Sequence, residues 1–512
     1  MCGKRIQCYN ICKGNKEIGG KSLQKKALGV KKMYKMSNQT RQMNLFEDFK
    51  FPLGELDENN RWILMSKEIP WSAIEREYAL LFPSTQGKPA HDARLAYGVL
   101  LIQKKLNCSD RELVEQVKES PYLQYFVGAK EFTTKPLFGA STLVDFRKTM
   151  TVEFLAKANE LILAHKNDEE QTDDSDDDTP NGSKENDEKD EKVDRIESKT
   201  DNKGTLVIDA SCVCVDIAYP NDVSLLSDCR EKLEKMVDEL HVKGEGVKPR
   251  TRRNQARKQY LNFIKKKRKS KKEIRQAKRL QLEHVRRDLG YIDNFLALGR
   301  ELSPKLMALL LTIRLIYSQQ KEMYDEGKNT IKDRIVSLFQ PHVRPIVRGK
   351  AKAKTEFGAK TEISVVDGFV RIHKVSWDAY NESTSFKLAV ENFKQLTGHY
   401  PERVLVDQIY RNRDNLNFCK EFNIRMSGKP LGRPKKDQTV DKATIHKDHC
   451  DRNIVEGKFG EVKTTYGLER LSTKLKETSE TEIYIPITMM NLARKIRVNF
   501  YHLNMLFNRL AF

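Results

Sequence analysis

The spacing of apolar side chains divides the chain into a helical first part and a mixed second part. Between residues 45 and 166, apolar positions recur every three or four residues in several segments, which is typical of amphipathic helices. Ser109 is a candidate N-cap of one such helix because Glu112 stands at the capping-box position, and Ser141 is a candidate N-cap of a later one. The pattern predicts an N-terminal all-helical domain at 45–166.

The second part mixes strand and helix patterns. The run GTLVIDASCVCVDIAYP, residues 204–220, is apolar and β-branched and ends at a proline, which is typical of a strand. Two more strands are expected on either side of Asp367-Gly368, a dipeptide that favours a tight hairpin turn, and the apolar run RVLVDQIY gives another. The sequence therefore predicts an α/β core at 204–512 with a large helical insertion at about 221–340.

Two segments carry no such pattern. Residues 1–44 are basic and lack periodicity, which predicts a disordered N-terminus. Residues 167–203 are a low-complexity acidic stretch, in which Asp168 to Asp201 contain 16 acids and 5 bases, a net charge of −11. A segment of this composition cannot bury a core, so it is expected to be a disordered linker.

The net charge of the chain indicates what kind of partner it binds. Lys and Arg total 93 and Asp and Glu total 72, which gives +21, and since the acidic stretch contributes −11, the rest of the chain carries +32. This charge favours a polyanionic partner such as nucleic acid. On such a protein, the short helices of 45–166 suggest a DNA-binding domain of helix-turn-helix type, with a scaffold that touches no DNA as the alternative.

Composition also bears on the compartment. No apolar run is long enough to span a membrane and none resembles a secretory leader, so a cytoplasmic, nucleoid-associated protein is expected. The nine cysteines predict no metal framework, because no CxxC pair occurs and the ten histidines do not cluster near them. Cys212 and Cys214 alternate along the predicted first strand, and the simplest interpretation is that the cysteines are reduced thiols, buried or incidental.

Basic residues concentrate inside the predicted insertion. From Lys248 to Arg287 there are 18 bases and 2 acids, a net charge of +16. One interpretation is a DNA clamp, in which the charges neutralise phosphates and Tyr260 and Phe263 stack on unpaired bases. The other is a solvated helix whose aromatic rings pack inward. The charge favours the clamp, whereas the rings favour packing. The candidate DNA contacts in this segment are Arg252, Arg253, Lys266, Lys267 and Arg268.

Two of the predicted strands present an aspartate at their ends. LVID supplies Asp209, VLVD supplies Asp407, and Glu456 lies on a later helix. Carboxylates of this kind can converge on two Mg²⁺ ions, about 3.5–4 Å apart, that activate a water or a 3′-hydroxyl for attack on a phosphodiester. The three acids are therefore candidate metal ligands and candidate catalytic residues.

The stretch RNIVEGKFGEVK, which begins at Arg452, places one acid and two bases on one helix face. At about 100° per residue, Glu456 lies about 40° and Lys463 about 20° from Arg452. One interpretation is a surface salt-bridge ladder. The other is that Arg452 and Lys463 grip phosphates beside a metal-bound Glu456. Gly457 and Gly460 favour the second, because glycine costs a helix about 1 kcal/mol and suits a close approach of backbone or DNA.

The same spacing resembles the helix signature of the insertion-sequence DDE transposases, a family with a ribonuclease-H-like catalytic fold. The signature is tyrosine, two residues, arginine, three residues, glutamate, six residues, lysine. Arg452, Glu456 and Lys463 match it, whereas His449 stands where the tyrosine is expected. Histidine can still donate a hydrogen bond to a phosphate.

Further blocks are similar to the same family. They are VIDASCVCVDIAYPNDVSLL around Asp209, RPIVRGKAKAKTEFGAK at 344–360, EGKFGEVKTTYGLERL at 456–471 and PYLQYFVG at 121–128. The resemblance implies that the protein cuts double-stranded DNA at the ends of its own mobile element and joins the 3′ ends to a target, acting at least as a dimer on DNA. It implies a metal-binding triad of Asp209, Asp407 and Glu456, holding two Mg²⁺ ions with Mn²⁺ as a substitute. The candidate DNA contacts in the helix signature and these blocks are Arg452, Lys463, His449, Arg344, Arg348 and Lys350.

Three alternatives stay open. The first is a metal-dependent nuclease of the same fold that cuts without joining. The second is a catalytically inactive or domesticated DNA-binding derivative of a transposase. The third is a basic RNA-binding structural protein, for which the three acids would not converge.

Overall fold

The computed structural model describes most of the chain between residues 32 and 510. The described residues are 32–36, 48–52, 54–84, 86–165, 202–242, 244, 246–347, 355–432 and 442–510, with side chains of the last helix up to Asn499. Most of the predicted disordered N-terminus and acidic linker lies outside these ranges. The candidate DNA contacts Arg348 and Lys350 also lie outside the described residues.

The N-terminal part is helical. Its helices are α2 (Arg61–Lys67), α3 (Trp71–Ala79), α4 (Ala93–Leu106), α5 (Asp110–Glu119), α6 (Pro121–Phe126), α7 (Ala140–Thr149) and α8 (Val152–Ala164), beside a two-residue pairing of β1 (Lys32–Met33) with β2 (Lys88–Pro89). Ser109 caps α5 as predicted, because its side chain accepts the N–H of Glu112 at 3.2 Å. The prediction for Ser141 is wrong: α7 begins at Ala140, with Gly139 at the N-cap.

The second part is built on one mixed sheet. Its strands are β3 (Thr205–Val215), β4 (Arg344–Val347), β5 (Thr355–Val366), β6 (Phe369–Ser376), β7 (Arg403–Leu405), β8 (Arg425–Met426) and β9 (Arg470–Leu471). The main order is β4-β5-β3-β7-β8, with β6 also paired to β5 and β9 to β3. β3, β7 and β8 run parallel, whereas β5 is antiparallel to β3 and to β6. The predicted α/β organisation with an N-terminal helical region is thus confirmed.

Successive side chains of β3 point to opposite faces of the sheet, and both faces are covered. Leu206 and Ile208 point into a hydrophobic cluster with helices α13 (Phe386–Thr397) and α14 (Arg413–Glu421). Val207 and Val213 point the other way, into a larger cluster that includes residues of α15 (Lys442–Thr465) and α16 (Lys476–Leu510). Side chains at odd-numbered positions of β3 therefore face α15.

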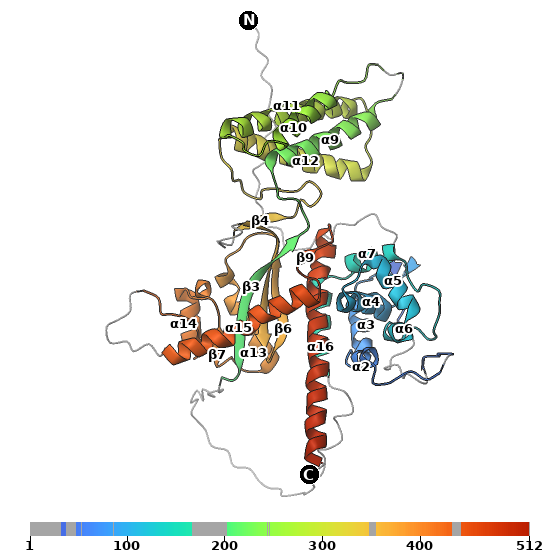
Figure 1. Ribbon diagram of the computed structural model, residues 1–512, viewed down its shortest axis with the longest axis vertical. Coiled ribbons are helices and arrows are strands. Elements are labelled where there is room, and N and C mark those ends of the chain that lie inside the picture. The colour runs from blue at the N-terminus through green and yellow to red at the C-terminus, as the bar shows by residue number, and fades with distance from the viewer. Residues whose placement is uncertain are drawn as a thin grey trace, which may run out of the picture.

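A bundle of four long helices lies between β3 and β4 in the sequence. The helices are α9 (Asp222–Leu240), α10 (Arg253–Ile264), α11 (Lys271–Ala297) and α12 (Pro304–Asp325), in the segment where periodicity predicts helix. α9, α11 and α12 pack around a hydrophobic cluster of their own, which includes Leu226, Leu233 and Ile313, and α10 packs against α9 and α11. Figure 1 shows this bundle beyond the β4 end of the sheet, apart from the other helices.

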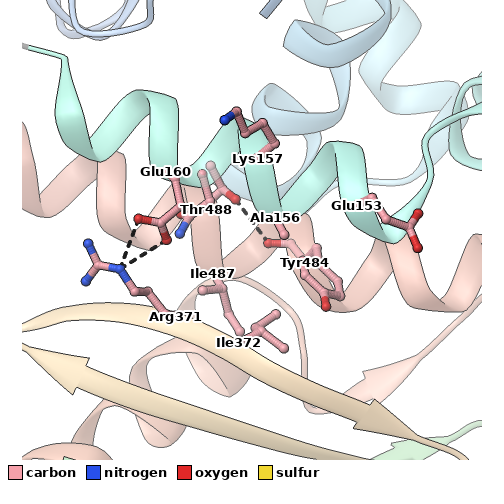
Figure 2. A pocket seen from close by; sticks show the side chains of 10 residues that line it. Glu153, Ala156, Lys157, Glu160, Arg371, Ile372, Tyr484, Ile487 and Thr488 are labelled. Atoms are coloured by element: carbon pink, nitrogen blue, oxygen red, sulfur yellow. Dashed lines mark hydrogen bonds and ion pairs between the residues drawn. The ribbon is translucent and has the colours of Figure 1, made fainter. Parts of the chain in front are cut away.

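The N-terminal helices share a hydrophobic core with the sheet. α16 packs against α4, α7 and α8 on one side and against β6 on another (Figure 1). Figure 2 shows Glu160 of α8 and Arg371 of β6 pointing toward each other beside a cavity of about 300 Å³, and their ion pair measures 3.0 Å. Asn491 of α16 donates to Val370 in β6 at 2.7 Å. None of the described helices has both the length and the apolar character needed to cross a membrane.

Candidate active site

The pairing of β3 with β7 places the two predicted aspartates side by side. The parallel register sets Val207 beside Leu405, so continuing it by two residues sets Asp209 beside Asp407. Val207 and Leu405 both belong to the cluster on the α15 face, and alternation gives Asp209 and Asp407 that same face. The continued register thus orients both carboxylates toward α15. The prediction that Asp209 ends a strand is wrong, because β3 runs on from it to Val215, whereas Asp407 follows the last residue of β7 by two positions.

The end of β7 turns sharply at the second aspartate. Asp407 is exposed and caps the short helix η3 (Gln408–Tyr410), accepting the N–H of Gln408 at 2.7 Å. Below this turn, Tyr410 donates its hydroxyl to Glu362 of β5 at 2.9 Å. Glu362 is fully buried, and burial raises the pKa of its carboxyl. This buried contact holds η3, and with it Asp407, against the sheet.

Glu456 approaches from α15, and an arginine connects it to β3. Val455 and Phe459 anchor the helix in the core, which leaves Glu456 on the solvent side with 57% of its side chain exposed. The guanidinium of Arg452 lies 3.1 Å from the carboxylate of Glu456 and 3.9 Å from that of Asp209. The structure therefore brings the three predicted acids to one region, with Arg452 between two of them.

The electrostatics of this region disfavour ionised Asp209. Burial raises its pKa to about 6, with Glu382 and Asp407 adding to the rise, while the Ala210 N–H and Arg452 act against it. Glu382 belongs to the short helix η2 (Glu382–Thr384) and is itself paired with Lys360 at 2.7 Å. No sequence pattern points to Glu382, because its proximity to Asp209 comes from the folding of the sheet.

The donor set suits a hard divalent cation. Three carboxylates on one solvent-open face are the ligands that Mg²⁺ combines with water and phosphate oxygens. Within the part of the chain that the structure describes, the one set of three potential ligand atoms within 4.8 Å of one another does not include these acids. The guanidinium of Arg452 lies between Asp209 and Glu456, so these two carboxylates share one cation.

The other signature residues have different surroundings. Lys463 is anchored to β3, donating to Ser211 Oγ at 2.9 Å and to the carbonyl of Cys212 at 3.3 Å. His449 is exposed on α15, seven residues after its first residue.

The glycines of α15 do not face another part of the chain. A Cβ added at Gly457 or at Gly460 would meet no atom of the described residues within 4 Å. Among the described residues no neighbouring backbone requires these glycines, and the close approach of a DNA strand stays a prediction.

The basic residues of the insertion divide into paired and exposed groups. Arg253 is paired with Asp238 at 2.7 Å and Lys266 with Glu273 at 2.7 Å. Arg252, Lys267 and Arg268 are exposed.

The two aromatic side chains of the insertion pack inward, as their pattern favours. Phe263 is 7% exposed, and the hydroxyl of Tyr260 donates to Ser224 at 3.2 Å. Arg344, at the start of β4, is also turned to its own chain: it donates to the carbonyl of Val343 at 3.1 Å and lies 3.6 Å from Asp378.

Two segments of the chain match known protein families. Residues 404–493 match the family described as "Transposase DDE domain", and residues 53–149 match "Transposase domain (DUF772)". Both matches are to transposase domains. The first covers Asp407 and Glu456 together with Arg452 and Lys463, whereas Asp209 lies outside both.

A curated relative is similar over a shorter stretch. The "Uncharacterized protein ORF8 in nfe locus" of Rhizobium meliloti is 32% identical over 80 residues, which is 16% of this chain and 38% of that protein. The chain thus spans well under two thirds of that relative's length. No solved structure matches the chain.

Proposed function

We propose that the protein is a DNA transposase with a ribonuclease-H-like catalytic core. It binds the ends of its own mobile element, cleaves phosphodiester bonds there with two divalent metal ions, and joins the 3′ ends to target DNA. The observation that carries this proposal is the parallel pairing of β3 with β7, which brings Asp209 of β3 near Asp407 just after β7, with Glu456 on α15 in a segment similar to transposase DDE domains. The mixed sheet with helices on both faces supports the ribonuclease-H-like assignment.

The three acids have the role of holding Mg²⁺, or Mn²⁺ in its place. Bound there, the ions would supply an activated oxygen nucleophile and stabilise the leaving oxygen of the phosphodiester. Asp209 contributes from within β3, and Asp407 contributes from the N-cap of η3 directly after β7. Glu456 contributes from the surface of α15, with 57% of its side chain exposed.

The basic groups around the acids have the role of holding DNA. Once Asp209 and Glu456 are neutralised, Arg452 is released to contact a phosphate beside the scissile bond. His449, exposed on the same helix, can reach the next phosphates. Lys463 positions β3 through Ser211 until a phosphate competes for its ammonium group.

The partner that fits the remaining charge is double-stranded DNA. The insertion presents Arg252, Lys267 and Arg268 to solvent, and it carries the densest basic stretch of the sequence. A transposase must hold two element ends, which requires at least a dimer on DNA. A protein that acts on this DNA is expected in the cytoplasm, in association with the nucleoid.

Cleavage of element-end DNA tests this function. The protein, Glu456→Gln and Glu461→Gln would each be incubated with Mg²⁺ and DNA that flanks the gene. Glu461 is the matched control because it lies on α15 and pairs with Lys458 at 2.8 Å rather than with the site. We expect end cleavage and joining to a target plasmid by the protein and by Glu461→Gln, and DNA binding without cleavage by Glu456→Gln.

The outcomes separate the alternatives. Cleavage without strand transfer would indicate a nuclease of this fold. Binding of DNA by all three proteins with cleavage by none, in Mg²⁺ and in Mn²⁺, would indicate a non-catalytic derivative. Preference for RNA with no end cleavage would overturn the transposase function.

A further inference from the structure

Two thiols and a carboxylate meet at the far end of β3 from Asp209. The sulfur atoms of Cys212 and Cys214 and a carboxylate oxygen of Glu356 all lie within 4.8 Å of one another. Cys212 is buried, and the other two are half-buried. The cluster is separate from the predicted catalytic acids, because no atom of Asp209, Asp407 or Glu456 belongs to it.

The sheet explains why these residues meet. Cys212 and Cys214 are two residues apart on one strand, so both side chains point to the same face. In the antiparallel register with β5, Cys214 lies opposite Gly358, and Glu356 stands two residues further along on that same face. Sequence spacing could not show this, since Glu356 follows Cys214 by 142 residues (356 − 214).

A glycine brings the two strands close at this point. A Cβ built at Gly358 would lie 2.0 Å from the carbonyl oxygen of Val213 and 2.9 Å from the Cα of Cys214. Backbone atoms cannot move aside as a flexible side chain can, so position 358 excludes every residue with a side chain. Gly358 is the residue opposite Cys214, and because it has no side chain, it places none between the Cys214 thiol and the Glu356 carboxylate.

The ligand chemistry fits a thiophilic divalent ion. Zn²⁺ takes cysteine sulfur at about 2.3 Å in tetrahedral geometry, which sets two sulfurs about 3.8 Å apart, so the observed cluster needs to contract by no more than about 1 Å. Two thiolates and a carboxylate leave one position for water. Bound Zn²⁺ would leave one net negative charge, and Lys463 and Arg470 both act electrostatically on Cys214.

An ion bound at this location would have a structural role. The chain leaves the sheet for the helical bundle after β3 and returns through β4, which pairs with β5 across Ile346 and Glu356 (Figure 1). We propose that Cys212, Cys214 and Glu356 bind one Zn²⁺-type ion that joins β3 to β5 at the base of the helical insertion. The proposal is independent of the transposase function, because it involves none of the residues assigned to DNA cleavage.

Cobalt substitution tests the site in the full chain. The reduced, chelator-treated protein would be titrated with Co²⁺, whose bonds to thiolate sulfur give a charge-transfer absorption band that oxygen ligands do not give. We expect one equivalent of Co²⁺ to produce the band and Zn²⁺ to abolish it. Cys214→Ser should lose the band and Glu356→Gln should bind at least tenfold more weakly. Cys450→Ser, which removes an exposed cysteine on α15, should behave as the unaltered protein.

A second measurement needs no variant. Alkylation of each cysteine would be followed by peptide mass spectrometry with and without Zn²⁺. We expect Zn²⁺ to protect Cys212 and Cys214 while Cys450 reacts at the same rate in both conditions. Absence of the cobalt band in fully reduced protein, a band that persists in Cys214→Ser, or alkylation of Cys214 that Zn²⁺ does not slow would each overturn the proposal.

Discussion

Asp209 is expected to destabilise the metal-free protein at neutral pH, and its replacement by asparagine should reverse this. Burial, with help from Glu382 and Asp407, raises its pKa from 3.8 to about 6. The unfolded chain releases this proton at lower pH than the folded chain, so stability falls as pH rises between the two values. At about 1.4 kcal/mol per pKa unit, the loss above pH 6 is about 3 kcal/mol. With 20% of the side chain exposed, this figure is an upper estimate.

The asparagine variant isolates this effect. Asp209→Asn keeps an oxygen that can accept the N–H of Ala210, but it cannot ionise. It should raise the free energy of unfolding by about 1–3 kcal/mol near pH 8 and change it little near pH 4, where Asp209 is protonated in the folded state. Mg²⁺ should stabilise the unaltered protein near pH 8 and have a smaller effect on the variant, which lacks one anionic ligand.

Urea unfolding in the presence of a chelator or of Mg²⁺, at both pH values, measures these differences. Asp414→Asn is the control, because Asp414 is 76% exposed and pairs with Lys387 on the surface. An Asp209→Asn variant that is less stable than the unaltered protein near pH 8, or whose advantage is the same at both pH values, would refute the reasoning. The carboxylate would then be compensated in the folded state by groups other than a metal.

Three further substitutions probe the surroundings of the site. Gly460→Ala should stabilise α15 by about 0.5–1 kcal/mol in thermal unfolding, since open space surrounds the position, and should weaken binding of element-end DNA in a filter assay. Tyr410→Phe should cost about 1–3 kcal/mol of stability by removing a donor from buried Glu362, and it should slow cleavage more than DNA binding, because η3 carries Asp407. Gly358→Ala should lower the melting temperature and the soluble yield, because its Cβ would overlap the Val213 carbonyl.

Local chemistry made the strands and the hairpin predictable. β3 is a run of apolar and β-branched residues, and it forms at Thr205–Val215, within the stretch where the pattern predicts it. The turn at Asp367 and Gly368 has φ values of 52° and 80°, which that dipeptide tolerates and most others do not. The same apolar patterns led to Asp209 and Asp407, but Asp209 lies within β3 rather than at its end, and Asp407 follows the last residue of β7 by two positions.

Contacts between distant segments were not predictable from one sequence. Lys463 contacts Ser211 across 252 residues, and Lys495 of α16 lies 3.0 Å from Glu68 in the N-terminal part. Such pairs are created by the packing of whole elements, and no periodicity encodes them. The bridging position of Arg452 belongs to the same class: the helix spacing predicts its pairing with Glu456, whereas its approach to Asp209 depends on where α15 crosses the sheet.

The position of Arg452 links metal binding to DNA binding. The guanidinium of Arg452 pairs with the carboxylates of Asp209 and Glu456, and the fold holds a third acid near Asp209. A divalent ion at the same carboxylates makes that cation redundant, and a guanidinium released beside the site is a ready partner for a phosphate. Under the proposed function, a salt-bridge ladder and a phosphate grip would be successive states of the same residues. Arg452 would limit the repulsion between the acids in the metal-free protein and would bind a DNA phosphate once metal and DNA are present.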